Sequence, residues 1–345
     1  MYRRIIRPLL FTLPPEQAHY LTLKAIRALG ALPPARALVT RYFKPQDKPV
    51  QAFGLTFKNP VGLAAGYDKD ADSWRGLACL GFGHIEVGTI TPVPQAGNPK
   101  PRVFRLVEDQ AVINRMGFPG KGAAYALQQL QNDRPADVVI GVNIGKNKDT
   151  PLETAFTDYL SLIETFAPLA DYLAINISSP NTAGLRKLQS RGYLETLLYE
   201  ITAKREQVSG MIGRSVPLLV KLAPDLEFDE IDEALDAITA AGIDGIIAAN
   251  TTTHRPTLRS KYQNEEGGLS GAPLAERSND VIRHIRKSAG DSIPIIGVGG
   301  IMNADDAQRK LDAGANLVQI YTGLVYRGPG LIRQIVNELA TSPAK

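Results

Sequence analysis

The chain has 345 residues, 44% of them hydrophobic and 21% charged, with 39 Lys and Arg against 35 Asp and Glu. This composition excludes a disordered or collagen-like chain, and the length predicts two domains or one large barrel with an appendage. The single cysteine, Cys79, excludes an internal disulfide and a thiolate metal cage, and no apolar run approaches the roughly 20 residues that span a bilayer.

Positive charge is concentrated at the start of the chain. The first fifty residues carry nine basic and two acidic residues, a net charge of +7, whereas the whole chain carries +4. A nucleic-acid-binding protein would spread basic residues more widely, so we expect no nucleic-acid partner. An apolar and basic segment instead suits an anionic membrane surface. Pro14-Pro15 interrupts the first apolar run, which argues against a signal peptide.

Two helices are predicted before residue 44. The first begins at Pro14-Pro15 and ends at Gly30, and the second begins at Pro34. Spacings of three and four place one apolar face on the first helix (Ala18, Leu21, Ala25, Leu29) and one on the second (Ala35, Leu38, Val39, Tyr42). The proline-rich stretch 44–49 reads as a linker. We therefore predict a helical segment at 1–44 and a separate domain at 50–340.

Short apolar runs alternate with helical patterns after the linker. Runs this continuously apolar are typical of parallel strands buried on both faces. The predicted strands are Val61–Ala65, Ile85–Thr89, Val138–Asn143, Tyr172–Ile177, Pro217–Leu222, Gly245–Asn250, Pro294–Gly299 and Leu317–Thr322. Eight strands with intervening helices, among them one capped by Asn303, predict a (β/α)8 TIM barrel with a short N-terminal helical extension. A doubly wound sheet is the alternative, because ring closure leaves no mark in a sequence.

Some segments exceed a minimal barrel. Residues 51–58 and the pair Val103–Leu106 and Ala111–Asn114 read as hairpins. The connections 90–137, 178–216 and 251–293 are long, and barrel chemistry sits at the carboxyl ends of strands. We expect these three loops to roof a substrate chamber.

Polar and glycine residues gather at the predicted strand ends. Gly297–Gly300 and Tyr321–Gly323 occupy the usual phosphate position of a barrel, although they could be tight turns without a ligand. Lys221 lies inside a predicted buried run. Three roles would explain a lysine there: a Schiff-base amine, a fixed positive charge beside a cofactor, or a partner in an ion pair with a carboxylate. Five asparagines share this end and suit a planar ring with alternating C=O and N–H groups: Asn114, Asn143, Asn176, Asn181 and Asn250.

Conventional acid–base residues are scarce. Of the four histidines only His254 follows a strand end, and no spacing resembles a metal site, so we expect no metal. His84, His284 and Cys79 fit structural roles. The loop 176–182 contains serines that could carry the proton chemistry.

Six motifs in order give the chain a resemblance to the quinone-dependent, class 2 dihydroorotate dehydrogenases over its whole length. They are Ala64–Lys69, Asn114–Phe118, Asn143–Asn147, Asn176–Thr182, Lys221–Asp225 and Gly297–Ile301. The resemblance implies an FMN-dependent oxidoreductase that oxidises (S)-dihydroorotate to orotate in pyrimidine (UMP) biosynthesis, with hydride transfer to FMN and re-oxidation by a membrane quinone.

The resemblance also assigns site residues. It implies FMN contacts from Ala65, Gly66, Thr89, Asn143, Asn176, Lys221, Gly271, Gly300, Tyr321 and Thr322. It implies dihydroorotate contacts from Lys69, Asn114, Arg115, Met116, Gly117, Phe118, Asn176, Asn181, Asn250 and Thr251. Ser179 would be the base that takes the C5 proton, with Thr182 as its relay, and Lys221 would stabilise the charge of the reduced flavin.

The resemblance gives the basic helical segment a purpose as well. Class 2 members use such a segment to dock on a membrane and guide quinone toward the flavin. We therefore expect a monomer, held peripherally on the cytoplasmic face of the inner (cell) membrane. An ordinary packing element is the alternative for this segment.

The sequence departs from the family in two places. Ala249 stands where many members have threonine, and the loop 254–266 differs in length. Two rival functions remain: a lyase or aldolase that uses Lys221 as a Schiff-base amine, and a non-catalytic membrane scaffold. Lys221 and Ser179 at opposite ends of the barrel, or a carboxylate filling the space beside Lys221, would end the proposal of a flavin site.

Overall fold

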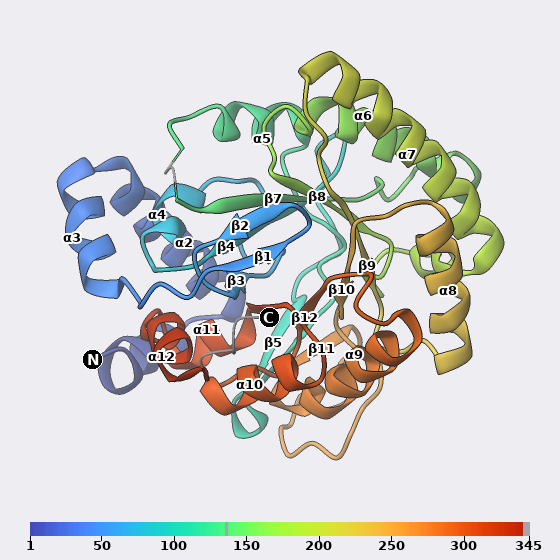
Figure 1. Ribbon diagram of the computed structural model, residues 1–345. Coiled ribbons are helices and arrows are strands. Elements are labelled where there is room, and N and C mark those ends of the chain that lie inside the picture. Colours follow the sequence, from blue (N-terminus) through green and yellow to red (C-terminus); the bar gives the residue numbers. More distant parts are fainter. Residues whose placement is uncertain (135–136, 341–345) are drawn as a thin grey trace.

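The computed structural model describes residues 1–134 and 137–340, and its centre is a closed ring of eight parallel strands (Figure 1). The strands are β3 (Val61–Leu63), β4 (His84–Ile90), β7 (Val139–Ile144), β8 (Tyr172–Asn176), β9 (Leu218–Leu222), β10 (Gly245–Ala248), β12 (Ile295–Val298) and β13 (Leu317–Ile320). The ring closes where β13 pairs with β3 and β9 pairs with β10. The predicted barrel is confirmed, and the doubly wound alternative is wrong.

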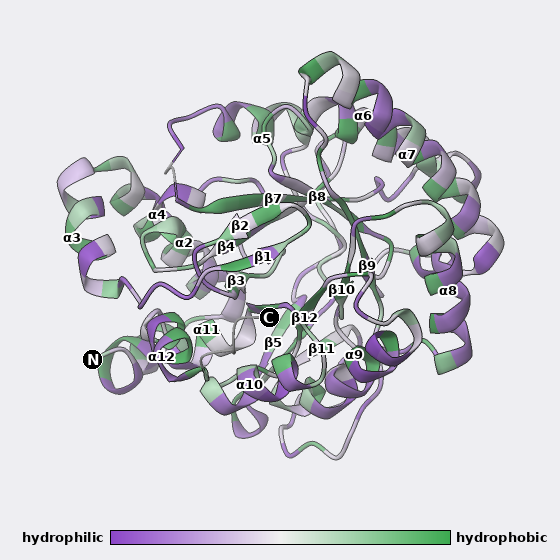
Figure 2. Cartoon of the chain, in the orientation of Figure 1, coloured by the Kyte–Doolittle hydropathy of each residue, from purple (hydrophilic) through white to green (hydrophobic). Residues whose placement is uncertain are grey.

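Helices surround this ring. They are α4 (Trp74–Ala78), α5 (Ala123–Leu130), α6 (Ala155–Phe166), α7 (Arg191–Ile212), α8 (Phe228–Ala240), α9 (Ala275–Ala289), α10 (Ala304–Asp312), α11 (Thr322–Arg327) and α12 (Gly330–Glu338). Figure 2 shows the continuous apolar colour of the strands beside helices that are apolar on one side and polar on the other. The predicted Asn303 cap is present, because its side chain accepts a hydrogen bond from the backbone N–H of Asp306.

The first predicted hairpin covers the end of the barrel at which the strands begin. Its strands β1 (Val50–Ala52) and β2 (Leu55–Phe57) pair antiparallel, and Phe57 is fully buried against side chains that fill the ring, among them Tyr172 and Leu219. Side chains of the hairpin and of the strands thus fill this end of the barrel.

The second predicted hairpin gains a strand that the sequence did not indicate. The hairpin consists of β5 (Val103–Leu106) and β6 (Ala111–Asn114), and β11 (Gly268–Gly271) pairs with β6 along its other edge. Glycines at both ends of β11 made that segment look like loop. The small sheet ties the first and third long connections together. Asn98 of the first connection also donates to the carbonyl of Asn181 in the second (3.1 Å).

The N-terminal segment consists of a short π-helix (Tyr2–Ile6) and three α-helices: α1 (Arg7–Phe11), α2 (Pro15–Ala31) and α3 (Pro33–Phe43). Helix α2 meets α4 at backbone distance, because a Cβ on Gly30 would lie 2.6 Å from the backbone nitrogen of Gly76. The predicted apolar face of α2 is borne out only in part: Ala18 is buried and Leu29 is partly buried, whereas Leu21 and Ala25 are exposed. Leu23 and Ile26 pack against the main hydrophobic core, and Gly30 lies against Gly76.

The first residues of the chain also reach its C-terminal part. The Tyr2 hydroxyl donates to the carbonyl of Val325 (2.7 Å), and Arg7 donates to the carbonyl of Tyr326 (3.3 Å). The Tyr2 ring lies against Gly328, where an added Cβ would approach it to 2.3 Å. The helical segment is therefore anchored both at α4 and beside α11.

Candidate active site

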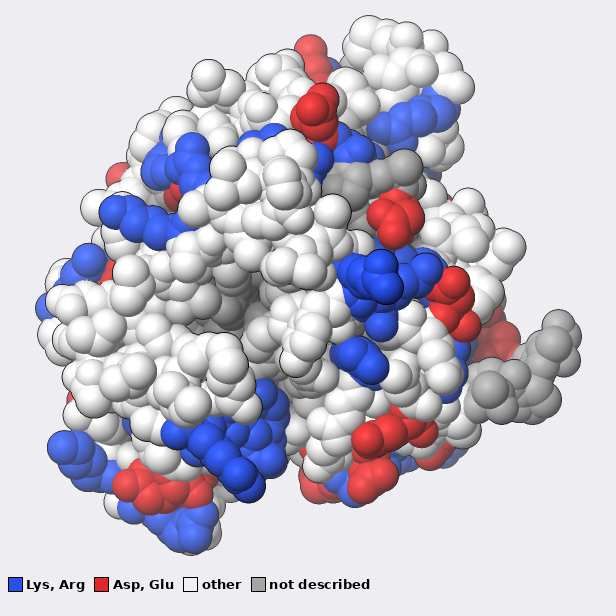
Figure 3. Space-filling model, turned by 90° about the vertical axis from the view of Figure 1, so that its left-hand side faces the viewer, with Lys and Arg blue, Asp and Glu red and all other residues white. Residues whose placement is uncertain are grey.

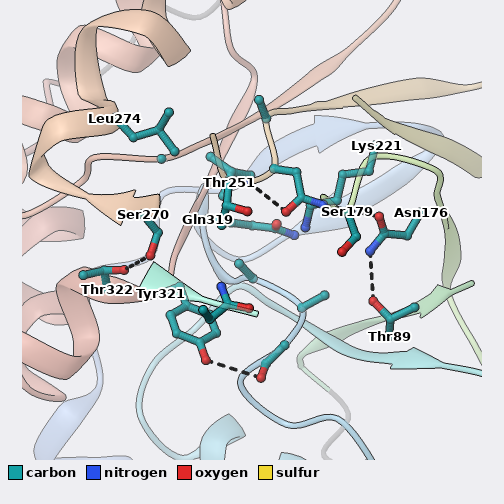
Figure 4. A pocket seen from close by; sticks show the side chains of 18 of the residues that line it. Thr89, Asn176, Ser179, Lys221, Thr251, Ser270, Leu274, Gln319, Tyr321 and Thr322 are labelled. Atoms are coloured by element: carbon teal, nitrogen blue, oxygen red, sulfur yellow. Dashed lines mark hydrogen bonds between the residues drawn. The ribbon is translucent and has the colours of Figure 1, made fainter. Parts of the chain in front are cut away.

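A pocket opens among the carboxyl ends of the barrel strands, beneath the three long loops. It encloses about 1030 Å³ of space free of protein atoms, its open mouth included. Most residues to which the sequence assigned a site role line it (Figure 4). They are Ala65, Gly66, Lys69, Thr89, Asn114, Met116, Gly117, Phe118, Asn176, Ser179, Asn181, Lys221, Asn250, Thr251, Gly271, Gly300, Tyr321 and Thr322. Lys221 and Ser179 thus lie at the same end of the barrel.

Two of the residues assigned to ligands lie elsewhere. Asn143 is behind the lining, where its Oδ1 accepts hydrogen bonds from Thr89 Oγ1 (2.5 Å) and Asn176 Nδ2 (3.1 Å). The guanidinium of Arg115 binds Glu265 (2.8 Å) and lies over the Phe104 ring. Asn143 therefore contacts the lining residues Thr89 and Asn176 instead of the pocket. Arg115 joins the loop 254–266 to β5.

A carboxylate does stand beside Lys221, contrary to the expectation. Lys221 Nζ lies 3.5 Å from Oε1 of Glu86, a fully buried residue of β4. Glu86 lies behind the lining and Lys221 lines the pocket, so the ammonium is paired on one side and faces the pocket on the other. The ion pair that was one of the alternatives for Lys221 is therefore present, and its role as a fixed positive charge beside a cofactor stays a prediction. The same signal, a charged residue in a buried run, would have identified Glu86.

The hydroxyl of Ser179 lies in the pocket lining. It is buried, and its Oγ accepts a 3.3 Å hydrogen bond from the backbone N–H of Asn181. Thr182, its expected relay partner, lies outside the lining. Its buried Oγ1 has no hydrogen-bond partner among the residues that the structure describes. A proton could enter or leave this loop without first breaking a strong internal bond.

A second ammonium, that of Lys69, lines the pocket. Burial lowers the pKa of Lys69 to about 8, and its Nζ donates to the carbonyl of Gly66. The ring of Tyr67 next to it contacts Tyr321 of the pocket and His19 of α2, edge to face. Burial lowers the pKa of His19 to about 3. The N-terminal segment thus reaches the pocket wall through uncharged rings.

Glycines and hydroxyls line the part of the pocket that follows β12 and β13. Gly299 and Gly300 have positive φ angles of 116° and 78°, a conformation that suits glycine. Thr322 Oγ1 lies 2.8 Å from Ser270 Oγ. Backbone N–H groups and hydroxyls of this kind are typical phosphate ligands.

Sequence reasoning gave no role to several lining residues. Gln319 stands inside buried β13, a polar signal like that of Lys221, whereas Leu274 and Ser270 come from segments read as loop. Ala249 lines the pocket with a side chain that cannot hydrogen-bond.

Within residues 1–134 and 137–340, no group of three His, Cys, Asp or Glu side chains could hold a metal ion. Nor is any helix of this described part long and apolar enough to cross a membrane.

The loop 254–266, whose course the sequence left open, lies beside the roof sheet. Arg255 donates to the carbonyls of Glu265 (2.9 Å) and Gly267 (2.6 Å) and so closes the base of the loop. Leu258 packs with the apolar side chains of β5, β6 and β11. The loop is therefore part of the roof.

Known proteins match the chain along nearly its whole length. The family model described as dihydroorotate dehydrogenase matches residues 49–342. A protein of Acidithiobacillus ferrooxidans named dihydroorotate dehydrogenase (quinone) is 52% identical over 340 residues, 97% of this chain and 93% of that protein. A protein of the same name from Janthinobacterium sp. is 48% identical, with 97% of both chains covered.

Solved structures match as well. DHODH from Eimeria tenella in complex with ferulenol has a TM-score of 0.83 and 38% identity, over 94% of this chain and 90% of that one. The ligand-free form from the same organism has a TM-score of 0.83 and 39% identity, over 92% and 93%. The family model covers most of the chain, and the relatives cover both the barrel and the helical segment. The chain belongs to the dihydroorotate dehydrogenase family.

Proposed function

We propose that this protein is an FMN-dependent, quinone-linked dihydroorotate dehydrogenase that oxidises (S)-dihydroorotate to orotate in pyrimidine biosynthesis. One observation carries the proposal: the ammonium of Lys221, a set of asparagine amides and the hydroxyl of Ser179 line the same closed-ended pocket. The names of the relatives point to the same activity.

The residues present fit FMN. The pocket has a buried cation at one end and glycines with hydroxyls at the other. At Gly66, an added Cβ would meet Tyr321 alone within 4 Å, at 3.5 Å, so a side chain there would occupy pocket space. Gln319 Oε1 is a buried acceptor that lacks a partner within the described part of the chain. A flat, polar-edged ring would satisfy such groups.

Lys221, Thr89, Asn176 and Gln319 would hold the ring of FMN, and the glycines at 299–300 with Thr322 and Ser270 would hold its phosphate. When bound, FMN supplies the acceptor for the hydride that leaves C6 of dihydroorotate. Lys221 contributes a fixed positive charge where negative charge develops, which stabilises the transition state without reorganisation.

Dihydroorotate would bind among Asn114, Asn176, Asn181 and Asn250, with Lys69 as the partner of its carboxylate. Ser179 Oγ would take the C5 proton. Serine is a weak base at its ordinary pKa, so it needs a dry site and an outlet for the proton. The roof loops would limit access of water, and the hydroxyl of Thr182, which is buried without a partner among the described residues, would be that outlet.

Residues 1–44 would provide the membrane and quinone end of the reaction. Large apolar side chains on α2 and α3 are exposed, among them Tyr20, Leu21, Leu38 and Tyr42, and basic residues accompany them. Figure 3 shows a hollow on this side of the molecule with an uncharged border and with Lys and Arg gathered beyond it. Apolar and basic groups together favour an anionic membrane, peripherally bound. Deleting residues 1–44 should spare reduction by dihydroorotate and impair turnover with a long-chain quinone.

The decisive experiment is an absorbance spectrum of the purified protein, recorded without oxygen before and after addition of dihydroorotate. We expect a flavin spectrum that bleaches on addition. A colourless protein, or one in which borohydride traps a carbonyl substrate on Lys221, would contradict the proposal and favour the scaffold or the aldolase.

A further inference from the structure

Glu86 connects five of the eight barrel strands through one carboxylate. Its Oε1 accepts a hydrogen bond from Asn143 Nδ2 (2.8 Å) and lies 3.5 Å from Lys221 Nζ. Its Oε2 accepts hydrogen bonds from the Tyr172 hydroxyl (3.1 Å) and Gln319 Nε2 (2.8 Å). Every partner donates, as an ionised carboxylate requires. A charge so fully buried needs a counter-ion, and Lys221 is the cation in contact with it.

The hydrogen bonds of the pocket amides also require an acceptor at the position of Glu86. The backbone N–H of Ser178 donates to Asn176 Oδ1 (3.3 Å), so Asn176 must turn its Nδ2 toward Asn143 Oδ1 (3.1 Å). Asn143 then has its Nδ2 left for Glu86. A backbone N–H can only donate and a carboxylate can only accept, so both ends fix the same orientation for the two amides.

A third amide joins the outer end of this row. The backbone N–H of Thr251 donates to Asn250 Oδ1 (2.8 Å), which turns Asn250 Nδ2 toward Asn176 Oδ1 (3.3 Å). Asn250, Asn176, Lys221 and Gln319 all line the pocket, and Glu86 lies behind them. The buried carboxylate is therefore linked to four lining residues, directly or through one or two amides.

We propose, resting on the flavin site proposed above, that Glu86 is a positioning residue. Its carboxylate fixes the ammonium of Lys221, orients the row Asn143, Asn176 and Asn250, and offsets one positive charge beneath the pocket. Negative charge behind Lys221 makes additional negative charge in the pocket less favourable. Glu86 thus limits how strongly the site favours reduced over oxidised flavin.

The test is the midpoint potential of the flavin in Glu86→Gln, a change that removes the charge and keeps the shape. The FMN-loaded protein is titrated with dithionite against reference dyes. We expect the affinity for reduced relative to oxidised flavin to rise at least about tenfold, which is about 30 mV for a two-electron couple. An unchanged or lower potential would overturn the proposal.

Tyr172→Phe is the matched control. It removes a neutral donor from the same carboxylate, outside the pocket lining, and leaves the charge in place. Its shift should be less than about a third of that in Glu86→Gln. Equal shifts would mean that the potential follows packing rather than charge, and would also overturn the proposal.

Thermal unfolding covers the case in which Glu86→Gln does not fold or does not hold FMN. Removing one member of a buried ion pair costs more than removing both. The double variant Glu86→Gln/Lys221→Met should therefore unfold at a higher temperature than Glu86→Gln, and strictly additive losses would reject the pairing. Dithionite supplies the electrons, so neither readout depends on dihydroorotate. A parent protein without flavin would count against the proposed function, and the unfolding comparison would still decide the role of Glu86.

Discussion

The barrel and the N-terminal helices use their apolar residues in different ways. Every residue of β8 and β9 is buried, and even the charged Lys221 is enclosed with its partner. Helices α2 and α3, all of whose residues the structure describes, bury Ala18 and Gly30 alone. Burial so complete stabilises a fold, whereas apolar surface left exposed on a docked helix suits a partner outside the chain. Chemistry and stability should therefore depend on the barrel, and attachment should depend on the helices.

The largest expected effect is in the barrel. In Ser179→Ala, reduction of the flavin by dihydroorotate should slow about 10²- to 10⁴-fold, because the C5 proton loses its acceptor. Stopped-flow absorbance without oxygen measures this rate. The variant should retain its flavin spectrum, and re-oxidation by a short-chain quinone should be unchanged. Reduction at the parent rate would remove Ser179 from the mechanism.

The next largest effect is on the free energy of unfolding, which should differ between the barrel and the N-terminal helices. Ile175→Ala, in a fully buried position of β8, should lower the free energy of unfolding by about 2–5 kcal/mol. Leu38→Ala on α3, where the side chain is 70% exposed, should change it by less than about 0.5 kcal/mol. Urea unfolding followed by circular dichroism compares the two. A large loss in Leu38→Ala would show that α3 stabilises the fold, which would break the comparison.

Charge on the helices gives a smaller effect. Arg41→Gln/Lys44→Gln should weaken binding to vesicles of anionic lipid about tenfold or more, since each basic residue near the surface contributes about 1 kcal/mol. Sedimentation with vesicles measures binding, and reduction by dihydroorotate should stay as in the parent. Arg283→Gln/Lys287→Gln on α9 makes the same change of charge on the barrel and should bind vesicles normally. Equal losses in both variants would assign the attraction to net charge alone.

The remaining effect concerns pH. Burial lowers the pKa of Lys69 to about 8, so Lys69 is charged below that pH and loses its positive charge as the pH rises through it. The KM for dihydroorotate should then rise above pH 8 by up to about tenfold per unit, because the carboxylate loses its partner. Initial rates between about pH 6.5 and about pH 9.5 test this. A KM independent of pH would assign the carboxylate to other donors.

The same contrast explains what the sequence could predict. Apolar runs predict the eight strands because a strand buried on both faces tolerates few polar residues, and charged residues inside such runs point to the site. The face of α2 could not be predicted in this way. Two apolar stripes compete on that helix, and the close approach of Gly30 to Gly76, a tertiary contact, selects between them.

The site shows the same limit. Motif order identifies most of the lining, because the carboxyl ends of parallel strands converge. Arg115 was misplaced because its partner Glu265 lies 150 residues later, and β11 was missed because its pairing with β6 is equally distant in the chain. Partners so far apart leave no local pattern.

The anchoring of Tyr2 beside Gly328 has a consequence for how the protein is made. The ribosome releases the first residues long before residues 325–328 exist, and the hydrogen bond from Tyr2 to Val325 spans 323 positions. During translation the apolar and basic residues near Tyr2 therefore lack their packing partners until residues 325–328 have been made. A nascent chain could therefore meet a lipid surface before its barrel is complete, so delivery to the membrane need not follow folding.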